Sequence, residues 1–468
     1  MYSWCFPNLM TVTISSFLLA GCGGHDFAVV KGNPLSLFQA EKVRSVGDEN
    51  DITDETRAHA DSLDKILDGS LANQNDGTNF ISVVLSALQK DPIVLSQRRA
   101  VKAKLAAIGA SEAQKEYRVT TTIYGGIEDI TDNTKGVALG LNASRPIFDG
   151  GMLDAQIALK SFEADVAKSN LQATLNERAY KLGEIWIEVE KFDTLQRQID
   201  ERLSVLDPLM GQLEQVAKAG IGDVSKVTAA QRTVSAIRVT QSNISEGLAK
   251  ARLEFVSAYG EVKEDIAYDS EFISGLVPTE VHDGLSQTAP ILLARYASYQ
   301  AALANLQAIR AKDDFNVGFE ARALRPLAGS GYDSDESVGL VARKTLFNGG
   351  MLESEIEEAS ALVEAAVSDV ESTYRQGVRV IQSAQQSIES MDKAIALAKT
   401  NAQVTADEIV YLRQQLIIGG STLDSVLSAE ARMYEAESKE INFIAERRKA
   451  ELLIASSLGL LASSLNSQ

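Results

Sequence analysis

The sequence has little of the chemistry on which enzymes and metal proteins depend. Its 468 residues include 2 cysteines, 2 tryptophans and 3 histidines, and His25, His59 and His282 stand apart from one another along the chain. It has no glycine-rich phosphate loop after a strand, no nucleophile elbow, no HExxH motif and no CxxC motif. We therefore predict a protein that is not an enzyme, with no catalytic residue, no metal site and no cofactor.

The chain also has fewer basic than acidic side chains. The chain has 64 acidic and 45 basic residues, for a formal net charge of −19 at pH 7. A phosphate backbone is bound by a basic surface, so we predict no nucleic-acid partner. Two interpretations of the acidic excess remain open: a solvated helical surface, and an acidic interior that favours cations.

The first residues predict export from the cytoplasm. Residues 1–21 form an uncharged apolar run that ends in small residues, typical of a signal peptide and too short for a membrane span. Residues 19–22 read LAGC and resemble a bacterial lipobox, which implies cleavage before Cys22 and acylation of its thiol. The usual positive charge before the apolar run is absent, so a simple cleaved signal is the alternative. Because Cys5 would leave with the signal, we expect no internal disulfide in the mature chain.

A long internal duplication organises the rest of the chain. The stretch IFDGGML at 147–153 returns as LFNGGML at 346–352 (346 − 147 = 199), and the same offset relates Gly220 to Gly419. Chance resemblance of composition does not keep glycines in register over this distance. We predict an extended acidic segment at 22–80, a first repeat at 81–260, a linker at 261–285, a second repeat at 286–460 and a tail at 461–468.

Each repeat has the same predicted order of elements. It opens with a helix, from Asp91 in the first copy and Ala289 in the second (289 − 91 = 198), with a proline in the first turn. Alternating apolar residues then predict two short strands in each copy, at 119–125, 137–144, 317–323 and 338–343. A long helix, a turn that contains glycine and a returning helix follow. The pattern predicts a mainly α protein with four strands.

The long helices carry heptads. Steps of seven from Leu175 reach Leu182, Val189, Gln196, Leu203 and Met210, a series typical of paired, supercoiled helices. The second copy has a similar series from Tyr374. At about 1.5 Å per residue, such a helix is roughly 100 Å long. Pro208 is expected to break or kink it in the first copy.

Four strands are too few for a sealed barrel. A sheet in lipid closes on itself, because an open edge leaves backbone groups unpaired, and bacterial barrels have at least about eight strands. We therefore predict that copies of the chain share their strands and that the long helices continue the barrel as a second, helical wall. A tube of this kind is a conduit.

Several motifs recur in both repeats in the same order. The junctions RPIFDGGMLDAQI and RKTLFNGGMLESEI, the turns at Gly220 and Gly419, and the endings AYG at Gly260 and SLG at Gly459 extend from about residue 85 to 460. Together they resemble the TolC family of outer membrane efflux proteins. The resemblance implies a homotrimer in the outer membrane of a Gram-negative bacterium, with a 12-stranded β-barrel, four strands per chain, continuous with a periplasmic α-barrel of coiled-coil helices.

The resemblance also implies partners and particular residues. A periplasmic adaptor protein, linked to an inner-membrane pump that is an ABC or proton-driven transporter, is expected to dock at Gly220, Ile221, Ser225, Gly419, Gly420, Thr422 and Leu423. Where family members commonly place acidic side chains and an arginine around the closed periplasmic mouth, this sequence has Ser421, Asp424, Ser425 and Ser428. We therefore expect a weaker latch of serine hydrogen bonds, worth about 1 kcal/mol each.

Two subtypes and a different class of protein remain open. Lipidation is typical of ducts that serve proton-driven drug or metal pumps, whereas the IFDGG junction is closer to ducts of type I secretion, which we favour. The alternative class is a lipid-anchored periplasmic structural coiled coil without channel activity. The classes differ in whether the strand face that carries Leu139 and Leu340 contacts lipid.

Overall fold

The chain folds into long helices with one small sheet at their end. The computed structural model describes residues 80–129, 134–218, 224–260, 289–329, 332–418 and 420–464, together with residues 275 and 277. In chain order its elements are α3 (Phe80–Lys90), α4 (Pro92–Glu112), η1 (Ala113–Lys115), β1 (Arg118–Asp129), β2 (Thr134–Phe148), α5 (Met152–Lys218), α6 (Val224–Tyr259), α9 (Pro290–Arg310), η2 (Ala311–Asp313), β3 (Asn316–Gly329), β4 (Asp335–Arg343), α10 (Met351–Ile417), α11 (Leu423–Ser457) and α12 (Leu460–Ser464).

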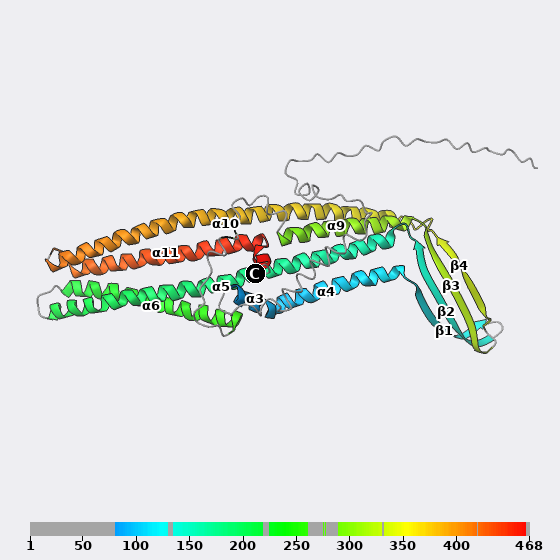
Figure 1. Cartoon of the computed structure of the whole chain (residues 1–468), viewed down its shortest axis with the longest axis horizontal. Coiled ribbons are helices and arrows are strands. Elements are labelled where there is room, and N and C mark those ends of the chain that lie inside the picture. The colour runs from blue at the N-terminus through cyan, green and yellow to red at the C-terminus, as the bar shows by residue number, and fades with distance from the viewer. Residues whose placement is uncertain are drawn as a thin grey trace, which may run out of the picture.

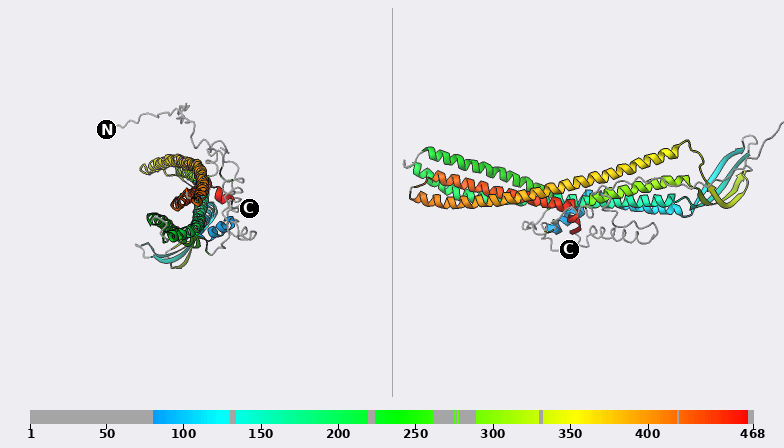
Figure 2. Two further views of the ribbon diagram at one scale, coloured as in Figure 1. Left: turned by 90° about the vertical axis from the view of Figure 1, so that its left-hand side faces the viewer. Right: turned by 90° about the horizontal axis from the view of Figure 1, so that it is seen from above.

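Two helices run along most of the molecule (Figure 1). α5 and α10 contain 67 residues each, so each is about 100 Å long at 1.5 Å per residue. α4 and α9 accompany them on the side of the sheet, and α6 and α11 accompany them toward the opposite end. Viewed along the long axis, the helices trace an arc that is open on one side (Figure 2). Among the helices of the described ranges, none combines the length and the apolar character needed to cross a lipid bilayer.

The four strands form an antiparallel meander in the order β1-β2-β3-β4. They contain 12, 15, 14 and 9 residues, and all four predicted strands are confirmed. In the middle of the sheet Leu141 on β2 lies opposite Thr121 on β1 and Ala323 on β3. The observed strands exceed the predicted ones because backbone pairing continues where the apolar alternation fades.

The glycine pairs of the duplicated motif turn the chain into the long helices. Gly150 and Gly151 have φ angles of 67° and 85°, and Gly349 and Gly350 have φ angles of 73° and 86°. Only glycine adopts this left-handed region without strain. A Cβ atom on Gly150 would also lie 2.5 Å from the side chain of Asp314. The repeated GG therefore reflects a backbone requirement at both junctions.

An aromatic cluster ties α3 and α6 to α5, and α3 lies near mid-length of the molecule (Figures 1 and 2). The rings of Phe80 and Phe255 each lie 5.2 Å from the ring of Trp186. Tyr259 lies 5.5 Å from Trp186 and donates a hydrogen bond of 2.7 Å to the carbonyl of Leu182. These contacts join α3 and α6 to α5 by packing.

Four of the six residues of the predicted heptad seam of α5 are buried, and Val189 and Gln196 are half-buried. Leu175, Leu182, Leu203 and Met210 all lie in hydrophobic clusters, as expected for paired helices. α5 continues through Pro208, so the expectation of a helix break there is wrong. Proline removes one backbone hydrogen bond, and the packed residues on either side of it hold the helix together.

Two short helices are absent from the sequence-based prediction. α3 lies where the predicted acidic segment gives way to the first repeat, and α12 lies at the start of the predicted tail. Leu88 of α3 and Leu461 of α12 belong to the same buried cluster as Leu171 of α5. Each helix is short, and tertiary burial rather than local periodicity defines it.

Candidate functional site

One face of the sheet is largely apolar and uncovered, and its polar members are Thr121 and the ion pair of Arg325 with Glu336. The side chains of Ile123, Val338 and Leu340 are 69%, 75% and 68% exposed. Val119 and Val338 lie on this face through the pairs Val119–Ala143, Ala143–Ala321 and Ala321–Val338. An exposed apolar face that reaches across all four strands marks a surface that another apolar phase or partner covers.

The opposite face of the sheet is polar. Asn142 lies opposite Thr120 on β1 and Arg322 on β3. On the same face, the guanidinium of Arg343 donates to the carboxylate of Glu320 over 2.6 Å. A sheet with one apolar and one polar face is suited to lie between an apolar and an aqueous environment.

Both edges of the sheet are open within one copy. In the described residues β1 pairs with β2 and β4 pairs with β3, so the outer backbone groups of β1 and β4 meet no further strand. Such an edge accepts another strand. Because successive strands alternate in direction, β4 of one copy is antiparallel to β1 of a copy placed beside it.

At the far end of the molecule, the turn between α10 and α11 is closed by its own polar groups. The hydroxyl of Ser421 donates to the carbonyl of Leu412 over 2.7 Å. Thr422 caps α11, because its Oγ1 accepts the N–H of Ser425 over 3.3 Å, and the two hydroxyl oxygens lie 2.8 Å apart. These hydroxyls therefore stabilise the hairpin that carries them.

Three other predicted mouth and docking residues lie at the start of α11. Leu423 packs against a buried cluster. Asp424 lies in the first turn of the helix, where the helix dipole favours an acid. Ser428 is half-buried one turn further on. The start of α11 therefore presents one acid beside a packed apolar side chain.

The remaining predicted docking residues belong to the two turns at this end. The backbone N–H of Gly420 donates to the carbonyl of Gln415 over 2.8 Å, which closes the end of α10. Ser225 is exposed in the first turn of α6. Four predicted residues lie outside the described residues: Cys22, Gly220, Ile221 and Gly419.

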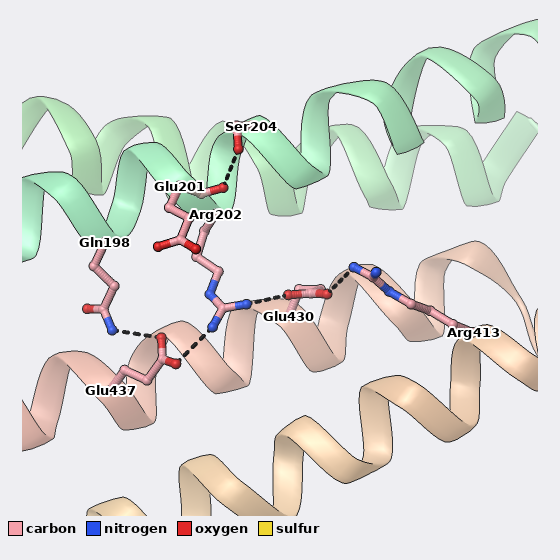
Figure 3. A network of polar contacts seen from close by, with 7 residues as sticks. All are labelled: Gln198, Glu201, Arg202, Ser204, Arg413, Glu430 and Glu437. Carbon is pink, nitrogen blue, oxygen red and sulfur yellow. Dashed lines mark hydrogen bonds and ion pairs between the residues drawn. The ribbon is translucent and has the colours of Figure 1, made fainter.

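A buried acid joins three helices near this turn (Figure 3). The side chain of Glu430 on α11 is 1% exposed. It accepts hydrogen bonds from Arg202 of α5 over 3.1 Å and from Arg413 of α10 over 2.7 Å. Arg202 also donates to Glu437 over 2.8 Å, and Gln198 donates to Glu437 over 2.7 Å. We call Arg202, Arg413, Glu430 and Glu437 the Glu430 clasp.

No residue of the clasp is among the predicted mouth residues, which all lie in the turn or at the start of α11. The signal was present as a heptad, because Leu423, Glu430 and Glu437 are seven residues apart and continue one face of α11. An acid in a seam position requires a cationic partner when it is buried. An arginine on each neighbouring helix supplies it, and ion pairs are therefore present beside the predicted serine latch.

More ion pairs join α5 to α11 toward mid-length. Arg448 donates to Glu190 over 2.9 Å, and Lys449 donates to Glu188, which also binds Lys191. Burial would raise the pKa of Glu188, but the hydrogen bonds from Lys191 and Lys449 outweigh it and hold that pKa below its ordinary value. Burial would lower the pKa of Lys449, but its carboxylate partners raise it. Ion pairs thus accompany the apolar packing between α5 and α11.

Within the ranges that the structure describes, no group of three or more His, Cys, Asp or Glu side chains is placed to hold a metal ion. No protein-family model matches the chain, and no curated protein matches it.

Solved structures do resemble the chain. A structure of CusC, from a study of folding and transmembrane channel formation, is 15% identical with a TM-score of 0.71 and covers 81% of this chain and 91% of that one. The outer membrane protein VceC of Vibrio cholerae is 18% identical with a TM-score of 0.69, covering 81% and 95%. The MtrE outer membrane channel of Neisseria gonorrhoeae, in its open state, is 14% identical with a TM-score of 0.62, covering 81% and 88%. The chain therefore has the fold of the TolC family of outer membrane channels.

Proposed function

We propose that three copies of this chain form a channel through the outer membrane, through which substrates leave the periplasm. The observation that carries the proposal is the four-stranded sheet, with an uncovered apolar face, a polar face and two open edges. Three such sheets, joined β4 to β1, close a 12-stranded barrel without a free edge. Lipid then covers the apolar face, and the polar face lines an aqueous lumen.

The long helices extend the lumen away from the membrane. Strands of 9 to 15 residues are long enough to cross the hydrocarbon core, while α5 and α10 continue for about 100 Å beyond the sheet. The arc of helices in one copy (Figure 2) supports a wall that three copies complete. We assign this wall to the periplasm, with Cys22 as the lipid anchor; the predicted acidic segment before residue 80 lies outside the described residues.

We assign the far end of the helices to the regulated mouth and to partner contacts. The turn residues Gly220, Ile221, Ser225, Gly419, Gly420, Thr422 and Leu423 would contact a periplasmic adaptor protein, and Ser421, Asp424, Ser425 and Ser428 would surround the constriction. The Glu430 clasp fixes the α10–α11 hairpin on α5, and so sets where these groups lie. An inner-membrane pump, ABC or proton-driven, would supply the energy for transport.

The matched variants Leu340→Lys and Ser337→Lys test the lipid-facing surface. Both residues lie on β4, Leu340 on the apolar face and Ser337 on the polar face opposite Arg322. Lysine at a lipid-facing position costs about 2–4 kcal/mol near the membrane midplane. We expect Leu340→Lys to reduce assembly into outer membranes strongly and Ser337→Lys to leave it intact, measured by the amount of protein in isolated outer membranes.

The same experiment separates the proposal from a structural coiled coil. If the strands only cap a periplasmic helical bundle, both lysine variants should behave alike, and the purified protein should not conduct ions across a planar bilayer. Equal behaviour of the two variants, together with absent conductance, would replace the channel with a lipid-anchored coiled coil.

A further inference from the structure

The first helix of each repeat has a different environment in the two repeats. α4 begins at Pro92 and α9 at Pro290, and they correspond to each other in the duplication (290 − 92 = 198). α9 lies between α5 and α10 and contacts both along its length. α4 packs along α5 and lies at the margin of the helical layer (Figure 1). One side of α4 therefore lacks the neighbour that α9 has.

The uncovered side of α4 can be identified residue by residue. α9 buries five alanines that recur at intervals of three and four residues, and hence lie on one helical face: Ala294, Ala297, Ala301, Ala304 and Ala308. Their counterparts on α4 are all exposed: Ser96, Arg99, Ala103, Ala106 and Ala110. This exposed face of α4 consists of small side chains, like the buried face of α9, except for the guanidinium of Arg99.

The helix that corresponds to the missing neighbour is α10. Within the chain, α9 packs against α5, the long helix of the other repeat. α10 is the counterpart of α5 in the duplication, because the two helices begin at Met351 and Met152 (351 − 152 = 199). The equivalent neighbour for α4 is therefore an α10. The chain's own α10 packs on α9 at the other margin of the layer, so the neighbour comes from a second copy.

The free face of α10 carries an acidic heptad. Ala359 and Val370 of α10 are buried, and Glu364 follows Ala359 by five residues, so it points about 140° away from it on the helix. Glu357 and Glu364 are exposed, and Glu371 is half-buried. These three acids are seven residues apart and share one face.

The two surfaces are complementary in charge. Residues 351–371 of α10 include seven acidic and no basic side chains. α4 exposes Arg99 and Lys102, its Lys104 binds Glu163 of α5, and its single acid is Glu112 at the sheet end. Two copies of either surface repel each other. The pairing is therefore head-to-tail, the arrangement that closes a ring.

The distance of each residue from the sheet sets the register between α4 and α10. α4 ends at Glu112 and α10 begins at Met351, both beside the sheet. Counted along the helices from these two ends, Arg99 and Glu364 are equally far from the sheet (112 − 99 = 13 and 364 − 351 = 13). Both are about 20 Å from the sheet at 1.5 Å per residue.

We propose that α10 of one copy packs along α4 of the next copy, with Glu364 opposite Arg99 and Ala361 opposite Ala103. The proposal rests on the proposed trimeric channel and specifies which surfaces join its subunits. The partner is a second copy of this chain, and the contact reproduces, between copies, the contact that α5 makes with α9 inside one copy.

Cysteine cross-linking tests the register in the full-length protein. The double variant Ala103→Cys with Ala361→Cys should form disulfide-linked dimers and trimers on a non-reducing gel. The control Ala103→Cys with Ser372→Cys uses an exposed residue close to the same α10 face but about 16 Å further along the helix (372 − 361 = 11). It should give only the background of the single variants. Equal cross-linking by both pairs would overturn the proposed register.

Exchanging the charges of Arg99 and Glu364 tests whether the two surfaces attract each other electrostatically. Arg99→Glu should lower the fraction of trimer at physiological ionic strength, measured by mass photometry in detergent, and adding Glu364→Arg should restore it. Failure of the second substitution to restore trimers would overturn the pairing.

The two proposals fail in different ways. If the protein is trimeric and conducts ions, but the Ala103 and Ala361 cysteines do not link, the channel stands and this contact is wrong. If the unsubstituted protein forms no trimer and conducts no ions, the proposed function itself fails.

Discussion

The two repeats share an element order but differ in how much of their surface the chain covers. In the second repeat, α9 packs against α5 and α10, and α11 packs against α10 and α5. In the first repeat, α4 and α6 pack chiefly along α5, and α6 leaves Leu253 and Val256 exposed. The chain therefore places both short helices of its second repeat between two long helices, whereas those of its first repeat lie at a margin. The outer side of α10 forms the other margin, with Leu397 and Tyr411 exposed, and in the proposed trimer another copy covers each margin.

The repeats differ in charge at the far end as well. In the duplication, Arg202 corresponds to Asn401 (401 − 202 = 199) and Glu430 corresponds to Gln231 (430 − 231 = 199). Inside one copy, the contact between α5 and α11 thus contains buried ion pairs. The equivalent contact in the proposed trimer, between α10 of one copy and α6 of the next, would have neutral amides at these positions. We expect the joint within a copy to be the stronger of the two.

Removing the arginine of the clasp should have the largest effect on stability. Arg202→Ala leaves the buried carboxylate of Glu430 with one cationic partner, and breaking a buried pair costs about 3 kcal/mol. Asn401→Ala at the equivalent, exposed position should cost less than about 0.5 kcal/mol. The measurement is the free energy of unfolding from urea titrations of the helical circular dichroism signal, and equal losses would refute the contrast between the joints.

A methyl group at the first junction glycine should have an intermediate effect. Gly150→Ala places a Cβ at a φ of 67° and against Asp314, which we expect to cost about 2 kcal/mol. Gly349→Ala has the same backbone strain at a φ of 73°, but its Cβ would meet nothing within 4 Å, so we expect about 1 kcal/mol. A larger loss for Gly349→Ala in the same urea titration would contradict the packing difference between the two junctions.

Acid should weaken the joint between α5 and α11 by the smallest amount. The pKa of Glu188 lies below its ordinary value of 4.5, so its contribution to stability is present above pH 4.5 and is lost as the pH falls through the lowered pKa. Partly exposed ion pairs contribute up to about 1 kcal/mol. Glu188→Gln should therefore destabilise the protein at pH 7 and have less effect at pH 3. An equal loss at both pH values would exclude a role for the carboxylate charge.

The long periodic features could be read from the sequence. The GG motifs, the heptads from Leu175 and the alternating strands are local patterns, so the order of helices and strands follows from them directly. The paired prolines at positions 92 and 290 place the helix starts for the same reason. These patterns also carried the resemblance that the solved structures support at the level of the fold.

The contacts between distant segments could not be read in the same way. Glu430 and Arg202 are 228 residues apart, and no local pattern indicates that they meet. Ser421 and Ser425 look like latch residues in a sequence, but their hydroxyls bond within their own hairpin. α3 depends on burial against Trp186, which is a property of the assembled core. The role of the two serines in closing the mouth stays a prediction.

The most direct test of the central claim combines the mass of the purified protein in detergent with its conductance in a planar lipid bilayer. We predict particles of three chains that open discrete ion-conducting pores. Single chains that leave the bilayer impermeable would contradict the account, because one copy of this sheet has too few strands to enclose a lumen.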